Sequence, residues 1–396
     1  MAVSLAIVII LGLFADYVFK KARLPGLIGM LLVGILCGPY VFNIIQPELL
    51  MISADLRMVA LIVILLRAGL ELRRDTLNRI GRPAALLSIV PAIFEGAVIT
   101  FLGHYYLHIS YLESAILGAI LAAVSPAVVV PLMIDFIDRR MGTKKGIPAL
   151  LLAGSSVDDV FVIVIFSILL GMYTGTHTNI PMKLVEIPES IVIGIGVGAL
   201  SGYIIYYVFK RFNPRATKMT IIIVTISILL TWLEEELKAK VAMSALLGVM
   251  TVGFIILEKS EIRAHKISQK LSKVWIFAEI LLFVLVGAQV NINVAWDAGL
   301  IGAVIIFIAL MGRSIGTYLC IIGTNLNFKE RLFCIISYIP KATVQAAIGA
   351  VPLEAGVKSG DIILAVAVLS ILFTAPLGAI GITITGRRWL EKEELI

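Results

Sequence analysis

The stretch LLLAGSSVDDVFVIVIFSILLGMY, residues 150–173, sets two adjacent carboxylates, Asp158 and Asp159, in a segment that is otherwise almost wholly apolar. The composition of the chain identifies the surroundings of that segment. Of 396 residues, 60% are hydrophobic and 15% are charged, and the mean hydropathy is +1.04. Soluble domains carry about 25% charged residues. The sequence therefore predicts an all-α polytopic membrane protein, a single transmembrane unit over residues 1–396.

The membrane spans are bounded by charged and Pro/Gly-rich breaks. A spanning helix needs about 20 mostly apolar residues. This length predicts thirteen spans, at 2–19, 25–43, 56–72, 83–103, 112–134, 147–173, 187–209, 219–235, 241–257, 271–290, 298–322, 330–352 and 360–385.

Basic residues orient these spans, because cytoplasmic connections are enriched in Lys and Arg. The segments that follow odd-numbered spans carry 25 Lys and Arg residues, and those that follow even-numbered spans carry five. This asymmetry places the N-terminus outside and the C-terminus inside, and it supports an odd number of spans. Because the net charge of +7 is distributed in this way, we expect no nucleic-acid partner.

Cofactor and enzyme chemistry are not indicated. The three cysteines show no disulfide or metal-binding spacing, and the four histidines lie in or beside polar connections. An intramembrane aspartyl protease would carry its two aspartates on separate helices, whereas these are adjacent, and no G-x-x-x-x-G-K-[ST] loop is present. We expect a transporter without a cofactor.

The paired aspartates are the first candidate site. A charge near the bilayer centre costs roughly 2.5 to 3.5 kcal/mol, so an ionisable residue within a span is a functional candidate. Adjacent helix positions point about 100° apart, so one of Asp158 and Asp159 can face a water-filled cavity and the other a neighbouring helix. Close carboxylates withdrawn from water bind protons more strongly, and a cation could replace such a proton. The alternative is a buried, protonated pair with a structural role only.

Oxygen ligands near these carboxylates favour a hard monovalent cation. Ser155 lies one helical turn before Asp159 and offers a hydroxyl oxygen on the same face. Na⁺ and Li⁺ are hard cations that suit oxygen ligands. We therefore predict a Na⁺ or Li⁺ site at Asp158 and Asp159 with Ser155 in support, whereas packing is an equally good explanation for Ser156.

Two further spans are interrupted by proline. The fifth contains AVSPAVVVPLM (123–133) and the twelfth contains YIPKATVQAAIGAVP (338–352). Proline removes an amide donor and disrupts the preceding helical turn, and broken backbone within a membrane must be buried in protein or line water. Span 12 comes seven spans after span 5, so the two would occupy equivalent positions in two halves of the chain. This odd offset relates spans 1–6 to spans 8–13 as inverted repeats, an architecture that alternating access uses.

Three basic residues, Arg67, Arg313 and Lys341, lie within predicted spans. The offset of seven brings Arg313 toward Glu95, and we expect Arg313 to pair with Glu95, with Asp158, or with each in different states. A fixed ion pair that only holds two helices together is the alternative. The ammonium of Lys341 could neutralise helix C-terminal carbonyls at a break, and we favour this structural role over direct ion chemistry.

Arg67 and Glu71 lie four residues apart near the inner end of the third span. We expect a pair at the helix end that extends to the membrane interface.

These motifs resemble the monovalent cation:proton antiporter superfamily, in particular its sodium/proton antiporters of the NHA type. The resemblance extends over essentially the whole chain and is carried by GSSVDDV (154–160), AVSPAVVVP (123–131), RAGLE (67–71) and IPKATVQAAIG (339–349).

The resemblance implies a homodimer with two sets of helices. Dimerisation and scaffold helices, approximately 1–43 and 187–257, would support a mobile core made of approximately 56–173 and, in part, 271–385. Two unwound helices of this core would cross near the paired aspartates.

The resemblance also implies roles for individual residues. Asp159 looks like the ion-binding and proton-exchanging carboxylate, and Asp158 like its supporting partner. Ser125 occupies the position of a hydroxyl-bearing residue in the first unwound helix, and Lys341 looks like the charge that compensates helix ends in the second. Several bacterial relatives carry a lysine where this chain has Arg313. Because arginine does not readily release its proton, electroneutral and electrogenic exchange both stay open.

The predicted function is secondary active antiport of Na⁺ or Li⁺ against H⁺ by alternating access, with cation and proton competing for Asp159. The expected partners are monovalent cations, protons, membrane lipid and a second copy of the chain, and the expected location is the cell (plasma) membrane. One alternative is a K⁺/H⁺ antiporter of the same fold. Another is a sodium-coupled symporter of an organic solute.

Overall fold

The computed structural model describes residues 1–22, 26–72, 74–175, 180–237, 241–290, 292 and 299–393. Apart from an isolated antiparallel bridge between Met141 and Lys392, these residues form helices joined by turns and short connections. The prediction of an all-α fold is confirmed for this part of the chain.

The helices, in chain order, are α1 (Ala2–Lys21), α2 (Gly26–Cys37), α3 (Pro47–Met51), α4 (Ser53–Glu71), α5 (Arg74–Leu87), α6 (Val90–Tyr106), α7 (Tyr111–Ala122), α8 (Pro126–Asp138), α9 (Ile147–Tyr173), α10 (Ile180–Phe212), α11 (Ala216–Leu237), α12 (Ala245–Lys259), α13 (Glu261–Ala288), α15 (Gly299–Cys320), α16 (Phe328–Ser337), α17 (Thr343–Ile348), α18 (Val351–Glu354) and α19 (Gly360–Trp389).

Among the described residues, nine helical segments are long and apolar enough to cross a membrane. They coincide with predicted spans 1, 4 to 8, 10, 11 and 13. The other four predicted spans contain α2, α4, α12 and the interrupted run from α16 to α18, which are shorter, more charged or broken. The chain is thus a multi-pass membrane protein, and the count of thirteen spans stays a prediction.

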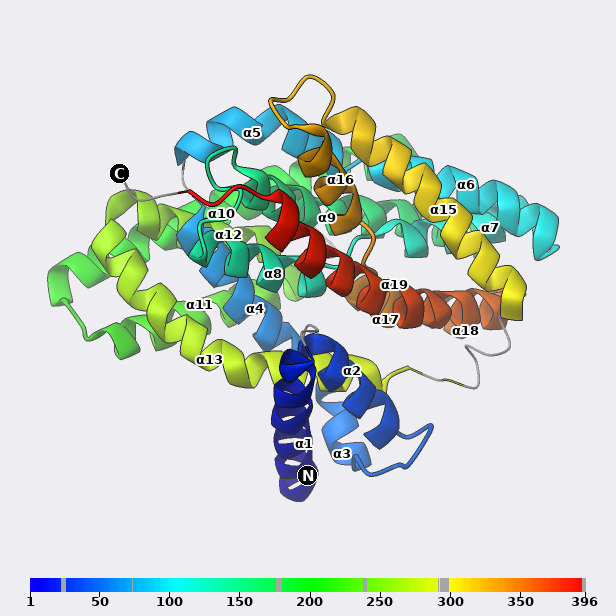
Figure 1. The fold of residues 1–396 in the computed structure, drawn as a ribbon, viewed down its shortest axis with the longest axis horizontal. Helices are drawn as coiled ribbons and strands as arrows, with labels where there is room; N and C mark the ends of the chain where they lie inside the picture. The colour runs from blue at the N-terminus through cyan, green and yellow to red at the C-terminus, as the bar shows by residue number, and fades with distance from the viewer. Residues whose placement is uncertain are drawn as a thin grey trace.

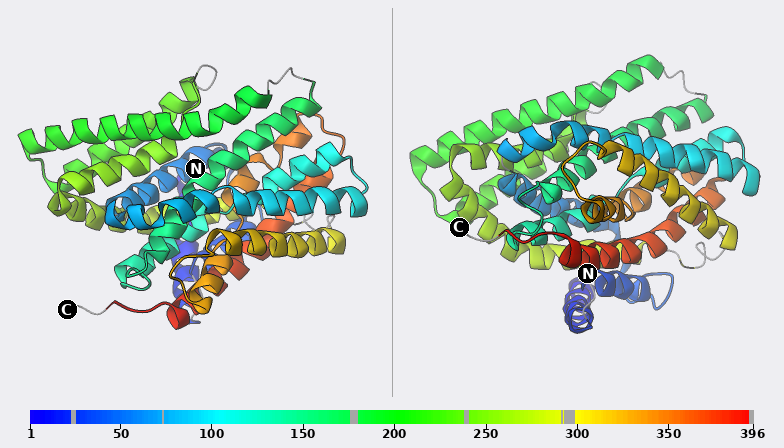
Figure 2. Two further views of the ribbon diagram at one scale, coloured as in Figure 1. Left: turned by 90° about the horizontal axis from the view of Figure 1, so that it is seen from above. Right: turned by 45° about the horizontal axis from the view of Figure 1, so that its top comes forward.

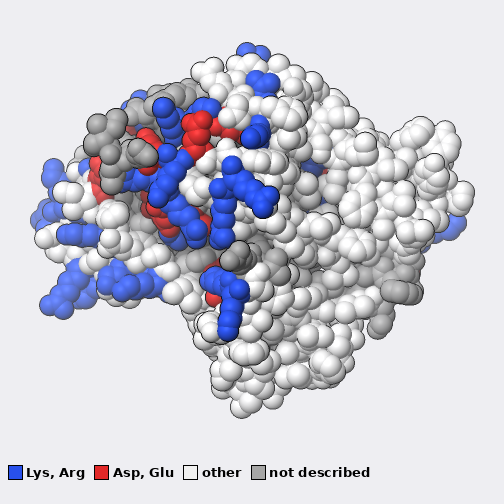
Figure 3. Space-filling view, viewed as in Figure 1, with Lys and Arg blue, Asp and Glu red and all other residues white. Residues whose placement is uncertain are grey.

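Some of the basic residues used for orientation cannot be placed. Arg23, Arg73, Lys238 and Lys240 lie outside the described residues, as do the side chains of Arg79 and Lys183. Figure 3 shows Lys and Arg mainly on the left of the face in view, with others at the top and at the right edge, and a broad uncharged surface over much of the rest.

Two connections predicted between spans are helical instead. The prediction ended one span at 72 and began the next at 83, but α5 covers most of that interval. Similarly, α13 begins at Glu261, ten residues before the predicted start of its span. An apolar run marks the part of a helix that meets lipid, and a helix continues past that run when its next turns are amphipathic. Ser260 takes the N-cap position of α13, and Glu261 stands in the first turn, where an acidic side chain is favourable.

The helices form two packed groups (Figures 1 and 2). In the first, α6 packs against α7 and α15, and α9 packs against α5, α7 and α8; in the second, α12 packs against α4 and α10, and α13 packs against α2 and α4. At the bottom of Figure 1, α1 extends away from the body beside α2. Glycines allow the closest approaches in the second group. A Cβ at Gly69 would lie 2.0 Å from the Met250 carbonyl oxygen, and one at Gly287 would lie 2.2 Å from that of Leu31.

The two proline-containing spans are interrupted where the sequence predicts. The first break separates α7 from α8 at residues 123–125, and the second separates α16 from α17 at residues 338–342. The N–H of Ser125 donates a hydrogen bond to the Pro340 carbonyl at 2.8 Å, so the two breaks are joined directly. Both lie in the protein interior, which is the environment that broken backbone requires in a membrane.

Candidate functional site

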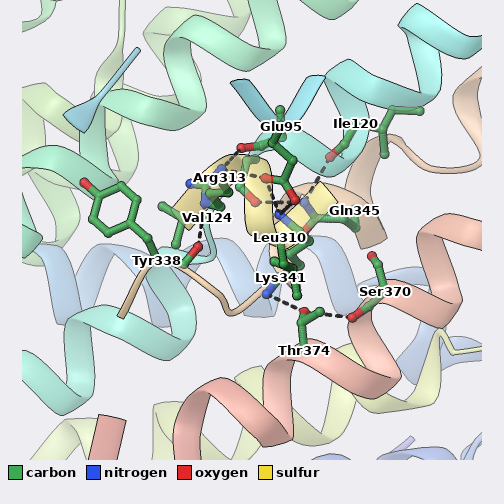
Figure 4. A network of polar contacts seen from close by, with 12 residues as sticks. Glu95, Ile120, Val124, Leu310, Arg313, Tyr338, Lys341, Gln345, Ser370 and Thr374 are labelled. Atoms are coloured by element: carbon green, nitrogen blue, oxygen red, sulfur yellow. Dashed lines mark hydrogen bonds and ion pairs between the residues drawn. The ribbon is translucent and has the colours of Figure 1, made fainter. Parts of the chain in front are cut away.

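Glu95, Arg313 and Lys341 form the centre of a buried polar network (Figure 4). Arg313 Nη1 and Lys341 Nζ each lie 2.8 Å from the carboxylate of Glu95, and all three side chains are at most 1% exposed. Charges withdrawn from water are tolerated when they are paired and hydrogen-bonded. The structure therefore brings together three residues that the sequence singled out from three different spans.

Arg313 also compensates the two helix breaks. Its guanidinium donates to the carbonyl of Ala122, the last residue of α7, and to that of Tyr338, at the end of α16. Carbonyls at helix C-termini lack partners within the helix, and a cation is favourable there. The sequence assigned this task to Lys341, but the ammonium of Lys341 lies on Glu95, and its backbone N–H donates to Thr374 Oγ1 at 3.0 Å.

Asp158 faces this network. Its Oδ2 accepts a hydrogen bond of 2.7 Å from the N–H of Val124 at the first break and lies 3.6 Å from Arg313 Nη2. Arg313 thus contacts both of its predicted partners at once. The contact of Val124 with Asp158 has a counterpart at the second break, where the N–H of Lys341 is bonded to Thr374. In each case a freed amide of a broken helix is held by a side chain of a long unbroken helix.

Asp159 differs from its neighbour. Its side chain makes no ion pair with any described residue, whereas Asp158 lies 3.6 Å from Arg313; the Oδ1 atoms of both aspartates are buried without a hydrogen-bond partner among these residues. The residue as a whole is partly exposed, whereas Asp158 is fully buried. Asp159 is thus the carboxylate of the pair that has no ion-pair partner among the described residues.

The two predicted serine ligands lie close to the aspartates but are engaged elsewhere. Ser155 is buried, and its hydroxyl donates to the Leu152 carbonyl at 3.2 Å in its own helix. Ser125 is also buried and joins the two breaks through its backbone, while its hydroxyl lies 3.4 Å from that of Thr343. Each hydroxyl oxygen can still accept, since a hydroxyl has two lone pairs.

Gln345 belongs to the network, although the sequence analysis did not single it out. Its Nε2 donates to the carbonyls of Ile120, at 2.9 Å, and Ala123, at 3.1 Å. It therefore holds the end of α7, where Arg313 contacts the Ala122 carbonyl. The available signal was a glutamine within an apolar span, because a polar side chain there needs a partner.

Comparison with known proteins identifies the family. Residues 5–388 match the family described as sodium/hydrogen exchanger, transmembrane. This chain belongs to that family. It is accordingly a cation:proton antiporter, a transporter and not an enzyme, and the resemblance inferred from its motifs is confirmed.

Two relatives support the same assignment, and one solved structure has a similar fold. Human sodium/hydrogen exchanger 9B2 is 33% identical over 383 residues, covering 94% of this chain and 71% of the human protein. Human sodium/hydrogen exchanger 9B1 is 30% identical over 394 residues, covering 93% and 73%. The sodium proton antiporter MjNhaP1 from Methanocaldococcus jannaschii, at pH 8, superposes with a TM-score of 0.78 at 20% identity, covering 97% of this chain and 96% of that one. The likeness to MjNhaP1 indicates a shared fold.

Proposed function

We propose that this antiporter exchanges Na⁺ or Li⁺ for H⁺ through competition of cation and proton for the Asp159 carboxylate. The observation that carries the proposal is that Asp159 makes no ion pair with any described residue, although it stands beside a network in which Glu95, Asp158, Arg313 and Lys341 are all paired. Asp158, Ser155 and Ser125 would support the ion with carboxylate, hydroxyl and backbone oxygens, which suit hard cations. One carboxylate that binds either ion couples the two fluxes without a second site.

The charge balance of the network supports one-for-one, electroneutral exchange. Two cations, Arg313 and Lys341, face two carboxylates, Glu95 and Asp158, and Asp159 stands outside this balance. If Asp159 binds one proton for transport in one direction and one Na⁺ for transport in the other, the site has the same net charge in both transport steps. The membrane potential then does no work on the exchange.

Alternating access by inverted repeats is part of the proposal. The matched contacts at the two breaks, Val124 with Asp158 and Lys341 with Thr374, favour a pseudo-twofold relation between spans 1–6 and 8–13. We further propose thirteen spans and a crossing of the two broken helices at these contacts. The N-terminus would lie outside and the C-terminus inside.

The helix packing bears on the proposed division into core and scaffold. We keep the division expected from the sequence, with scaffold helices at approximately 1–43 and 187–257 and core helices at approximately 56–173 and, in part, 271–385, except for α4 and α13. Since α4 and α13 pack against α12 and α2, we place these two helices with the scaffold. The contact of Arg67 with Asp138 joins α4 to α8. It would then cross the boundary between the scaffold and the mobile core. The predicted pair of Arg67 with Glu71 is wrong, because Glu71 accepts from Ser268 instead.

A second copy of the chain and membrane lipid are proposed partners, and the plasma membrane is the proposed location. Homodimerisation would bury part of the exposed apolar surface of the scaffold helices, such as Phe14 on α1 and Trp232 on α11, which are 65% and 56% exposed. Lipid would cover the remainder.

The test is dissipation of a pH gradient in proteoliposomes after addition of Na⁺, Li⁺, K⁺ or choline. We expect a response to Na⁺ and Li⁺ and none to choline. Asp159→Asn should abolish this response, while the matched variant Asp135→Asn should keep it, since Asp135 is 44% exposed and pairs with Arg139 on the surface. Full exchange by Asp159→Asn would refute the assignment.

The same assay separates the alternatives. A response to K⁺ at least as strong as that to Na⁺ would favour the K⁺/H⁺ antiporter. Uptake of a labelled organic solute driven by Na⁺, without cation:proton exchange, would instead indicate a symporter.

A further inference from the structure

An ion pair between half-buried Lys145 and buried Glu330 joins the starts of α9 and α16. Lys145 lies two residues before α9, and its Nζ is 2.9 Å from each carboxylate oxygen of Glu330, which is 1% exposed. Glu330 is also the third residue of α16 and forms a capping box with Asn327, through hydrogen bonds of 2.7 and 2.9 Å. One carboxylate therefore both begins α16 and ties it to the helix that carries the aspartates.

A matching contact joins the starts of α7 and α19. Glu113, 5% exposed, is the third residue of α7 and forms a capping box with Ser110. Its Oε1 accepts from the N–H of Ser359 at 3.2 Å and from the hydroxyl of Tyr173 at 3.4 Å. The Tyr173 hydroxyl in turn accepts from the N–H of Lys358 at 3.0 Å. This contact uses neutral donors where the first uses a lysine ammonium.

Both carboxylates stand at the far end of a helix that terminates in the ion site. α7 begins near Glu113 and ends at Ala122, whereas α16 begins near Glu330 and ends beside Tyr338. The carbonyls at these two inner ends are the ones that Arg313 contacts. Each carboxylate therefore anchors one of the two helices that hold the guanidinium.

Simple geometry shows how much the anchors matter. Glu330 and Tyr338 are eight residues apart, which is about 12 Å along a helix. A tilt of about 5° about a loosened outer end would move the Tyr338 carbonyl by about 1 Å, and a misplacement of about 1 Å can cost up to about 100-fold in rate.

We propose that Glu330 and Glu113 are positioning residues for the ion site. Held by Lys145 and Tyr173 respectively, they fix the far ends of the two broken helices and so keep Arg313 beside Asp158. The contact of Glu330 with Lys145 has the larger effect, because both of its partners are charged and it is shorter, at 2.9 Å against 3.4 Å for the Tyr173 hydroxyl on Glu113. The inference rests on the proposed exchange at Asp159.

The test measures the Michaelis constant (KM) for Na⁺ and the maximal exchange rate in proteoliposomes for four variants. Glu330→Gln removes the charge but keeps a side chain that can complete the capping box. Lys145→Met removes the ammonium, Lys145→Arg restores a cation, and Tyr173→Phe removes the bridging hydroxyl. We expect KM to rise about tenfold for Glu330→Gln and Lys145→Met, about threefold for Tyr173→Phe, and less than about twofold for Lys145→Arg.

Asp135→Asn is the matched control, since it removes an exposed acid from an exposed ion pair and should leave KM unchanged. The proposal would be overturned if Glu330→Gln and Tyr173→Phe lowered the yield or the thermal stability but kept the wild-type KM. If Lys145→Met does not fold, the KM values of these two variants test the proposal. Asp159→Asn, measured beside them, keeps the two proposals separate. Exchange by Asp159→Asn would refute the proposed function, whereas an inactive Asp159→Asn with wild-type KM in the anchor variants would refute only the anchors.

Discussion

Glu95→Gln tests the charge balance of the site most directly. The Glu95 carboxylate lies 2.8 Å from the guanidinium of Arg313 and 2.8 Å from the ammonium of Lys341, and the three side chains are at most 1% exposed. The substitution removes the negative charge of this carboxylate. Breaking a buried ion pair by removing one partner costs about 3–5 kcal/mol. The matched substitution Asp135→Asn breaks a pair whose side chains are 44% and 49% exposed, and such pairs contribute about 0–1 kcal/mol.

Thermal unfolding of the purified protein in detergent measures this difference. At about 2 °C per kcal/mol, the midpoint Tm should fall by roughly 6–10 °C for Glu95→Gln and by at most about 2 °C for Asp135→Asn. Adding Lys341→Met to Glu95→Gln removes the surplus cation and leaves Arg313 opposite Asp158. The double variant should therefore recover at least about half of the lost stability, a coupling that a double-mutant cycle reports. Equal losses for Glu95→Gln and Asp135→Asn, or purely additive losses in the double variant, would contradict the charge-balance argument.

Three further predictions concern packing and coupling. Gly69→Ala would place a Cβ 2.0 Å from the Met250 carbonyl oxygen and should lower the free energy of unfolding by about 1–3 kcal/mol. A Cβ at Gly196 would have nothing within 4 Å, so Gly196→Ala should raise the free energy of unfolding by about 0.5–1 kcal/mol. Thermal unfolding compares the two variants. Gly154→Ala would place a Cβ 2.1 Å from the Tyr338 hydroxyl, so its loss of Tm should be relieved when Tyr338→Phe is added. Na⁺-driven exchange should run at the same rate whether or not K⁺ and valinomycin clamp the membrane potential; a rate that depends on the clamp would exclude one-for-one exchange.

Apolar length and proline predicted much of the fold. The bounds of α9, Ile147–Tyr173, agree with the predicted span residue for residue, because Lys145 and Gly146 precede a run that is apolar apart from the GSSVDD segment, and Thr174 and Gly175 follow it. The two helix breaks also followed from Pro126 and Pro340, since proline removes a donor wherever it stands in a helix. Helix ends outside the membrane did not follow, as α13 shows, because the polar turns of an amphipathic helix resemble a loop in hydropathy.

The site was predictable where a side chain is costly in a membrane and unpredictable where backbone supplies the contact. Glu95, Arg313 and Lys341 stood out as charges within spans, and the repeat offset predicted that Arg313 meets Glu95, but the contact of Lys341 with Glu95 was not predicted. The carbonyl of Ala122 and the N–H of Val124 could not be found in this way, because every residue carries these groups and only the break exposes them. The predicted Arg67–Glu71 pair was wrong for a related reason: it used local spacing, while the partner of Arg67 comes from another helix.

The presence of arginine at position 313 follows from the number of acceptors around it. Nitrogen atoms of its guanidinium contact Glu95, Asp158 and the two carbonyls that end α7 and α16. The planar fork of arginine can point donors in several fixed directions, whereas lysine concentrates its charge at one atom. A lysine here would leave at least one helix end or carboxylate without its partner. The same guanidinium keeps its proton, so the residue that holds the breaks together is not itself a proton carrier, in keeping with the proposal that Asp159 exchanges a proton for a cation.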